Sequence, residues 1–120
     1  MEERGETVSV SDNLKRGTIE LMLLTLLNES DMYGYQLCQT LEERSEGLFI
    51  VKEGSLYPTL YRLLGKGLIS DRKEKVGVRR TRVYYHLESA GKEYLQEIRR
   101  EYDALSQGIL HVLQYTRKEG

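Results

Sequence analysis

Cysteine, tryptophan and long hydrophobic runs are scarce in this sequence of 120 residues, which has one cysteine and no tryptophan. The single cysteine, Cys38, excludes an internal disulfide bond and cannot build a structural zinc site by itself. No apolar run approaches the roughly 18 residues that span a bilayer, and no signal segment opens the chain. We therefore expect a soluble, cytoplasmic protein in which Cys38 is a small core residue.

The groups that carry catalysis are also sparse. The two histidines, His86 and His111, stand apart from each other, and Cys38 has no histidine near it in the sequence. No glycine-rich motif that would cradle a phosphate is present. We expect no enzyme, no cofactor and no metal site.

Charge is balanced overall but unevenly distributed. The formal net charge is −1, which by itself argues against a general nucleic-acid binder. The window from Arg62 to Tyr84 nevertheless holds eight basic residues and two acids, so it carries +6 and the rest of the chain carries −7. One basic face on an otherwise acidic protein steers that face toward a polyanion.

The most informative stretch runs from Glu53 to Lys66 and predicts one helix. Four leucines recur there at the spacing of a single apolar stripe: Leu56, Leu60, Leu63 and Leu64. We expect Gly54 or Ser55 to cap its start, Pro58 to lie in its first turn, and Gly67 to end it.

The outward face of this helix carries hydrogen-bond donors and cations, and no acid. It consists of Ser55, Pro58, Thr59, Tyr61, Arg62 and Lys66, with Tyr57 on the flank. Such a face suits a DNA major groove, where phosphates and base edges accept hydrogen bonds. An ordinary amphipathic surface helix is the alternative interpretation of this segment.

Two further helices precede this one. Thr18–Leu27 is apolar nearly all round, so that it is either a central core helix or is covered on one side by a second subunit. Met32–Arg44 follows as a helix capped by Asp31, and Leu48–Val51 has the composition of a short strand. Residues 1–13 are polar, and we expect a mobile arm or a short helix.

Two strands are predicted after Gly67, at Leu68–Lys75 and Thr81–Leu87, around a turn at Gly77. Three arginines lie at or beside the hairpin tip: Arg79, Arg80 and Arg82. Arginines in this position can enter a minor groove or bind phosphates. A charged tip that merely blocks edge-to-edge pairing would need fewer of them.

The order of helix, helix, short strand, helix and hairpin is that of a winged helix-turn-helix. In that fold the third helix reads the major groove and the hairpin, or wing, touches the flanking backbone. We expect a mainly α protein with a small β hairpin, in which residues 14–87 form the DNA-binding domain.

The last helix, predicted at Ser89–Thr116 within a C-terminal region of residues 88–120, has a heptad seam. The seam consists of Leu95, Ile98, Tyr102, Leu105, Ile109 and Val112. At about 1.5 Å per residue the helix is about 42 Å long, more than so small a domain can cover. We expect it to form a homodimer, whose two recognition helices would read half-sites about 34 Å apart in palindromic DNA. A helix folded back on its own domain would explain only the first two turns.

The sequence resembles the PadR family of bacterial transcriptional regulators over about residues 14–95. The matching segments are LKRGTIELMLLTLL, YGYQL, EERSEGLF, EGSLYPTLYRL, GKGLI, RRTRVYYHL and AGKEYL. The single C-terminal helix is similar to that of the shorter class of the family, whose members dimerise through it and the N-terminal helices. The resemblance implies a DNA-binding repressor with a small effector at or near the dimer interface.

The resemblance also implies roles for particular residues. Ser55, Tyr57, Thr59 and Arg62 match the recognition helix and the three arginines match the wing, while Tyr33 and Tyr35 match a helix that approaches the DNA backbone.

Two departures from the family pattern stand out. Glu88 replaces the usual threonine cap of the last helix, so we expect Ser89 to cap it. Tyr102 lies where some drug-responsive relatives have tryptophan, which makes it a possible effector contact.

Two functions are compatible with these patterns. The favoured one is a sequence-specific, homodimeric repressor that a small molecule releases from double-stranded DNA. The alternative is a winged-helix module that binds an acidic protein and no DNA.

Overall fold

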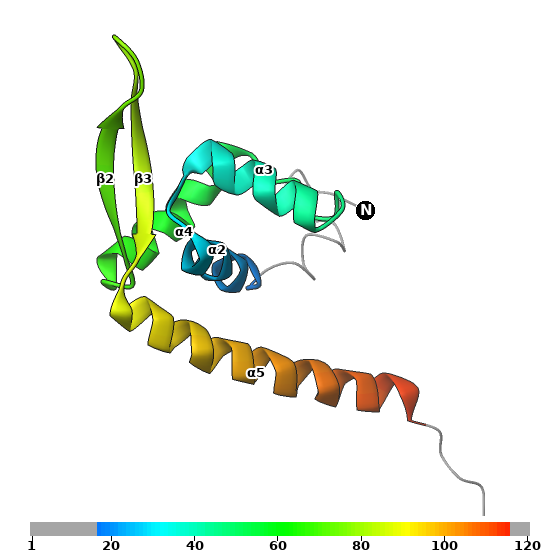
Figure 1. Cartoon of the computed structure of the whole chain (residues 1–120). Helices are drawn as coiled ribbons and strands as arrows, with labels where there is room; N and C mark the ends of the chain where they lie inside the picture. The colour runs from blue at the N-terminus through cyan, green and yellow to red at the C-terminus, as the bar shows by residue number, and fades with distance from the viewer. Residues whose placement is uncertain (1–16, 116–120) are drawn as a thin grey trace, which may run out of the picture.

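The computed structural model describes residues 17–115, so the expectation for the N-terminal arm lies outside the described part. The elements are α2 (Ile19–Glu29), β1 (Met32–Tyr33), α3 (Gly34–Arg44), α4 (Glu53–Gly65), β2 (Ile69–Lys75), β3 (Thr81–Leu87) and α5 (Ser89–Gln114). Figure 1 shows α2, α3 and α4 gathered beside the base of the β2–β3 hairpin, while α5 leads away from them. The predicted mainly helical fold with a small β hairpin is confirmed. Among the described helices, none is both long enough and apolar enough to cross a bilayer.

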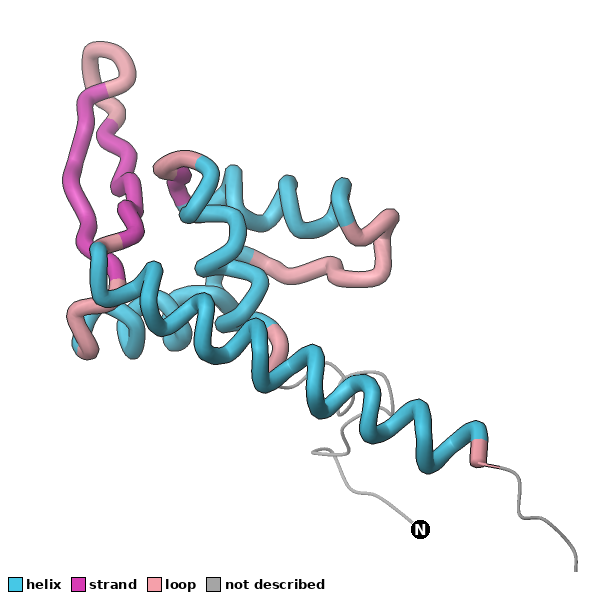
Figure 2. Tube along the Cα trace, turned by 60° about the horizontal axis from the view of Figure 1, so that its bottom comes forward, coloured by secondary structure: helices cyan, strands magenta, loops and turns pink. Residues whose placement is uncertain are grey.

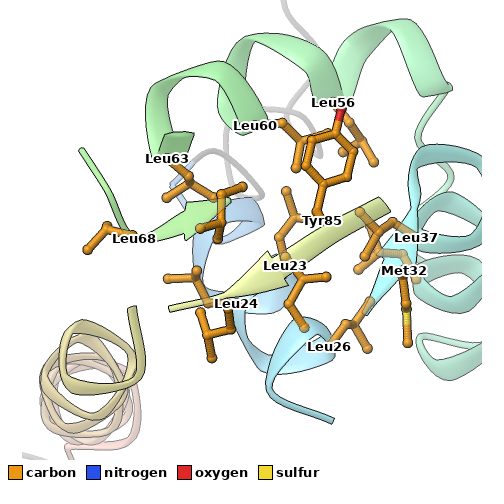
Figure 3. Close-up of a cluster of buried hydrophobic side chains, with 14 of the residues drawn as sticks. Leu23, Leu24, Leu26, Met32, Leu37, Leu56, Leu60, Leu63, Leu68 and Tyr85 are labelled. Carbon is orange, nitrogen blue, oxygen red and sulfur yellow. The ribbon is translucent and has the colours of Figure 1, made fainter. Parts of the chain in front are cut away.

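The core lies where α2, α3, α4 and β3 meet (Figure 3). Six leucines are almost completely buried there: Leu23, Leu24, Leu37, Leu56, Leu60 and Leu63. The stripe predicted for α4 is therefore its core face, and Leu64 packs beside it partly buried. From β3, Tyr85 and Leu87 close the core at the sheet. Burial of these side chains is the main source of stability, since each contributes about 1.5–3 kcal/mol.

The sheet is antiparallel with the strand order β1-β3-β2. In the hairpin Ile69 pairs with Leu87 and Lys75 pairs with Thr81, and Gly77 takes a φ of +127° in the turn. In β3 Tyr85 and Leu87 are buried, while His86 between them is exposed. One face of the sheet therefore packs on the helices and the other faces solvent.

The short strand is not where the sequence predicted it. Leu48–Val51 forms no strand, and Leu48 and Ile50 are exposed. The edge of β3 is instead taken by Met32–Tyr33, which pair with Tyr85 and Tyr84. As a result α3 begins only at Gly34, and Asp31 is not its cap. A two-residue strand is defined by its partner and not by its own propensity, so local composition could not locate it.

The start of α4 also differs from the prediction, whereas its end agrees. The N–H of Ser55 donates to the carbonyl of Lys52 (2.9 Å), so the first turn is closed before Ser55 and the helix begins at Glu53. Pro58 consequently lies in the second turn, inside the helix. At the other end Gly67 has a φ of +73°, and its N–H donates to the carbonyl of Leu64 (3.0 Å). This glycine stops the helix as predicted.

The long helix α5 starts on the domain and then leaves it (Figure 2). It begins at Ser89 with Glu88 in the cap position, so Ser89 is not the cap. The Glu88 carboxylate is held by the hydroxyl of Ser70 (2.5 Å). Leu95 and Ile98 pack partly buried against the core. The seam beyond them is exposed, as Tyr102, Leu105, Ile109 and Val112 are each 45% exposed or more.

Gly91 joins α5 to the sheet by direct backbone contact. A Cβ atom at this position would lie 2.2 Å from the carbonyl oxygen of Leu68 and 2.5 Å from Cδ1 of Leu87. Gly91→Ala should therefore push the start of α5 off the hairpin and lower the free energy of unfolding by about 2–3 kcal/mol, as measured by urea denaturation. Gly108→Ala in the same helix is the matched control, since nothing lies within 4 Å of that site. The control should gain up to about 1 kcal/mol from helix propensity, and a similar gain for Gly91→Ala would contradict the packing argument.

Candidate nucleic-acid interface

The outward face of α4 is polar and carries a pair of stacked aromatic rings. Ser55, Pro58 and Arg62 are exposed, and Thr59 is half-buried. Tyr61 is 63% exposed, and its ring lies 5.9 Å from that of Tyr57 with an angle of 18° between the planes. The buried leucines on the opposite side fix the rotation of the helix, so the polar face points outward as the sequence predicted.

The two cations at the far end of α4 have partners within the domain. Nε of Arg62 lies 3.6 Å from the carboxylate of Glu20 on α2. The hydroxyl of Tyr94 donates to the same carboxylate (2.8 Å), and Nζ of Lys66 lies 5.8 Å from the Tyr94 ring centroid. Both cations therefore lie on the flank of α4 that faces α2 and α5. Part of their charge is offset by Glu20.

The wing tip presents free positive charge. Arg79 and Arg80 are exposed, and within residues 17–115 neither side chain has an ion pair or a hydrogen bond. The exposed Lys73 and Lys75 lie farther along β2, on the same hairpin. Two guanidinium groups at the end of a narrow hairpin can approach a polyanion without first breaking internal contacts.

The third wing arginine is held by aromatic rings on the outer face of the sheet. The guanidinium of Arg82 lies 4.2 Å from the ring centroid of Tyr33, and Tyr33 meets Tyr84 edge to face at 5.4 Å. The guanidinium of Arg72 in turn lies 5.2 Å from the ring centroid of Tyr84. Because Tyr33 immediately precedes α3, this row of side chains connects the wing to the helix-turn-helix. It also fixes Arg82 in one orientation.

Asp31 organises the base of the wing, a role that the sequence did not suggest. Its carboxylate accepts a hydrogen bond from Nη1 of Arg72 on β2 and lies 2.8 Å from Nδ1 of His86 on β3. Arg72 also donates to Glu74 (2.8 Å). The count of +6 for the Arg62–Tyr84 window therefore overstates the charge available to a ligand. Asp31 lies 41 and 55 residues from its two partners, so no local pattern could have revealed the cluster.

The pKa of the Asp31 carboxyl is lowered by its hydrogen bond with His86, opposed by partial burial and lowered further by Arg72. A carboxyl with a lowered pKa stabilises the fold above its usual pKa of about 3.9, and this contribution is lost as the pH falls through the lowered value. Asp31→Asn should therefore reduce Tm by a few degrees near neutral pH. The difference from wild type should close below about pH 4.

Asp71→Asn is the matched control for this comparison, because Asp71 is an exposed carboxylate on β2 without an ion pair within residues 17–115. Its Tm should stay near that of wild type throughout the titration. A Tm difference for Asp31→Asn that persists unchanged into acid would contradict the assignment of the stabilisation to the Asp31 carboxylate.

Tyr35, the remaining predicted backbone contact, is 53% exposed on α3. Its hydroxyl accepts a hydrogen bond from Nε2 of Gln39 (3.2 Å). The predicted DNA-binding residues are thus spread over β1, α3, α4 and the hairpin, and the structure brings Tyr33 and Arg82 into direct contact. The part that the local sequence did not predict is the cluster of Asp31 with Arg72 and His86.

A groove of about 400 Å³ lies between α2, α3 and α5. Its apolar walls come from Leu21, Met22, Leu26, Leu41, Phe49 and Tyr102. Arg99 and Asp103 lie at its α5 side. Tyr102, the predicted effector contact, therefore lines a groove and at the same time belongs to the exposed seam of α5.

Known proteins share this fold. The profile of the transcriptional regulator PadR-like family matches residues 23–97. A transcriptional regulator of Mycobacterium tuberculosis is 31% identical over 106 residues, which cover 88% of this chain and 95% of that protein. A PadR-like transcriptional regulator from Bacillus cereus is similar in structure with a TM-score of 0.74 at 29% identity, over 87% of this chain and 99% of that chain.

A third similar structure is that of Bacillus subtilis PadR in complex with operator DNA. It matches with a TM-score of 0.62 at 25% identity, over 67% of this chain and 46% of that chain. The family and these neighbours are transcriptional regulators and not enzymes. Since the family profile covers the helix-turn-helix, the wing and the start of α5, the chain belongs to the PadR-like family of transcriptional regulators.

Proposed function

We propose that this protein is a cytoplasmic, homodimeric repressor that binds a palindromic operator and is released by a small-molecule effector. In this proposal α4 enters the major groove, and the wing contacts the flanking backbone or minor groove. Residues 14–87 are the DNA-binding domain, and residues 88–120 supply the dimerisation helix. The observation that carries the proposal is the pair of unpaired arginines, Arg79 and Arg80, at the tip of a wing that is connected to the recognition helix.

DNA binding is supported by how the charge is distributed. The free guanidinium groups lie at the wing tip, and α4 offers Ser55 and Tyr61 outward for hydrogen bonds and stacking. Phosphate contacts by the wing would fix the register, and the outward residues of α4 would read base edges. Arg62 and Lys66 are exposed at the far end of α4, and we propose that they contact phosphates beside the groove. The family neighbour in complex with operator DNA supports the same ligand.

Dimerisation is supported by the apolar surface that α5 leaves uncovered. Leu105 is 65% and Val112 is 76% exposed on the distal half of the helix, which is costly unless a second chain covers them. The groove between α2, α3 and α5 adjoins this seam at Tyr102. A second copy of α5 would bury the seam, and the two-fold axis would place two α4 helices on one face of the DNA.

The effector is proposed to bind where Tyr102 lines the groove, because a flat ring beside apolar walls suits an aromatic ligand. Binding there would change the packing of α5 and hence the spacing of the two recognition helices. Repression would end because both half-sites could no longer be contacted together.

The proposal is tested by fluorescence anisotropy with the duplex upstream of the protein's own coding region and a scrambled duplex of equal length. We expect a preference of about 10³ or more for the native duplex, with binding that weakens steeply as salt rises. Sedimentation of the free protein should give twice the mass of the chain. Equal, weak binding to both duplexes and to a pool of random sequences would overturn the proposal and lead to a search for an acidic protein partner.

A further inference from the structure

The first residues of α3 and α4 are in direct contact. Gly34 begins α3 and is buried, and Glu53 begins α4 and is half-buried. A Cβ atom at position 34 would lie 2.9 Å from Oε2 of Glu53, 3.2 Å from its Cγ and 3.4 Å from its Cδ. A side chain at position 34 would therefore require the Glu53 side chain to move from this position.

This contact has an electrostatic reason. The residue before α3, Tyr33, provides no side-chain cap for the helix, so the first amide groups of α3 lack that partner and form the positive end of the helix dipole. A carboxylate beside Gly34 offsets that partial charge. The absence of a side chain at Gly34 is what lets the carboxylate come so close.

The same carboxylate also reaches the recognition face. The hydroxyl of Tyr57 donates to Oε2 of Glu53 (2.8 Å), and this bond raises the pKa of Tyr57 to about 12. Tyr57 stacks on Tyr61, which is exposed on the outward face of α4. A chain of contacts thus runs from the start of α3 through Glu53 and Tyr57 to Tyr61.

We propose that Glu53 is a positioning residue for operator recognition, which fixes α4 against the start of α3 and holds Tyr57 and Tyr61 in place. The inference rests on the proposed operator binding and adds a residue that need not touch DNA. Base recognition requires that the outward side chains of α4 meet particular base edges while the wing holds the backbone. A small rotation of α4 would therefore reduce specific binding and leave phosphate contacts intact.

A direct base contact is the competing role for Glu53, because a carboxylate can accept a hydrogen bond from cytosine. The geometry favours positioning, since Oε2 is already engaged by Tyr57 and packed against Gly34. The two roles differ in one respect. Loss of a base contact would change the choice of base at one position only, whereas loss of positioning would weaken specific binding without changing the preferred base at a single position.

The experiment compares wild type with Gly34→Ala, Glu53→Ala and the double variant in full-length protein. Gly34 does not have a positive φ, and alanine is the better helix former, so any loss arises from the contact with Glu53. Each single variant should bind the operator about tenfold more weakly. The double variant should resemble Glu53→Ala alone, because the space beside position 34 is then open.

Binding to the scrambled duplex and the salt dependence should stay unchanged in all four proteins, because no cation is altered. A readout independent of DNA is the Tyr57 phenol, followed by NMR with Tyr57→Phe for assignment. The pKa of this phenol should be about 12 in wild type and lower in Glu53→Ala, because the hydrogen bond to Glu53 is the largest cause of the shift. Glu43→Ala, which removes an exposed carboxylate from α3, is the control for charge and should change none of these quantities.

Three results would overturn the inference. Additive losses in the double variant would show that Gly34 and Glu53 act separately, and an equal loss on the scrambled duplex would show a general effect on folding or charge. A change of preference at one base pair in Glu53→Ala would assign the direct role instead. If wild type prefers no duplex at all, the proposed function itself fails, whereas failure of the coupling alone leaves that function standing.

Discussion

Replacing Arg79 and Arg80 together by alanine is expected to weaken operator binding about a hundredfold near physiological salt. Both guanidinium groups are exposed at the wing tip and have no partner to lose within residues 17–115. Each phosphate contact releases counterions, so the slope of log K against log salt concentration should become shallower by about 1.8 for two contacts. Anisotropy titrations at several salt concentrations measure both quantities.

The matched control removes two positive charges elsewhere. Lys92 and Arg100 are exposed on α5 and do not belong to its seam, so Lys92→Ala with Arg100→Ala changes the net charge equally. That variant should keep nearly the full salt slope. If both double variants lose the same affinity, the wing would act only through total charge, and if neither loses any, the wing does not contact DNA.

The distinction between free and paired cations also bears on which other substitutions matter. Arg72 is engaged by Asp31 and Glu74 and rests on Tyr84, so its charge is largely committed to holding the wing. Removing it would loosen the base of the wing and would not simply delete a phosphate contact. The wing arginines and Arg72 have the same side chain, so the sequence does not distinguish their roles. The structure does, because it shows which of them have partners.

Periodic and local features of the fold were predictable from the sequence. The leucine stripe of α4, the stop at Gly67, the two long strands and the seam of α5 depend on spacings of two, three or four residues, or on one glycine. The leucine stripe of α4 forms as predicted because burial of the same leucines stabilises it in the folded chain. For the same reason the outward face of α4 was identified correctly once its apolar side was known.

Features that depend on distant partners were not predictable. The strand Met32–Tyr33 exists because β3 offers an edge, whereas the more strand-like Leu48–Val51 is not a strand in the structure. The need for glycine at position 34 arises from Glu53, nineteen residues away in the chain. Asp31 likewise suited a helix cap by local rules, yet Arg72 and His86 hold it at the wing. In each case tertiary contacts overrode a local preference.

Placing glutamate at both Leu105 and Ile109 is expected to convert the proposed dimer into a monomer and to weaken operator binding by about 10³-fold. Both side chains lie in the exposed part of the seam, 65% and 50% exposed. In a two-fold interface each would meet the partner's α5, so four carboxylates would have to lose water close to one another. A monomer binds one half-site without the second to reinforce it.

The same substitutions should leave the folded monomer intact, because the first turns of α5 and its distal seam have different contacts. Its first turns are anchored by Gly91, Leu95 and Ile98 on the domain's own core, whereas the distal seam touches none of that core. Circular dichroism should therefore show native helix content while sedimentation shows the mass of one chain. Gln107→Glu with Gln96→Glu, on exposed positions outside the seam, adds the same charge and should preserve the dimer. A double-glutamate seam variant that still sediments as a dimer would place the interface elsewhere and would leave the exposed apolar face of α5 as a surface for a different protein.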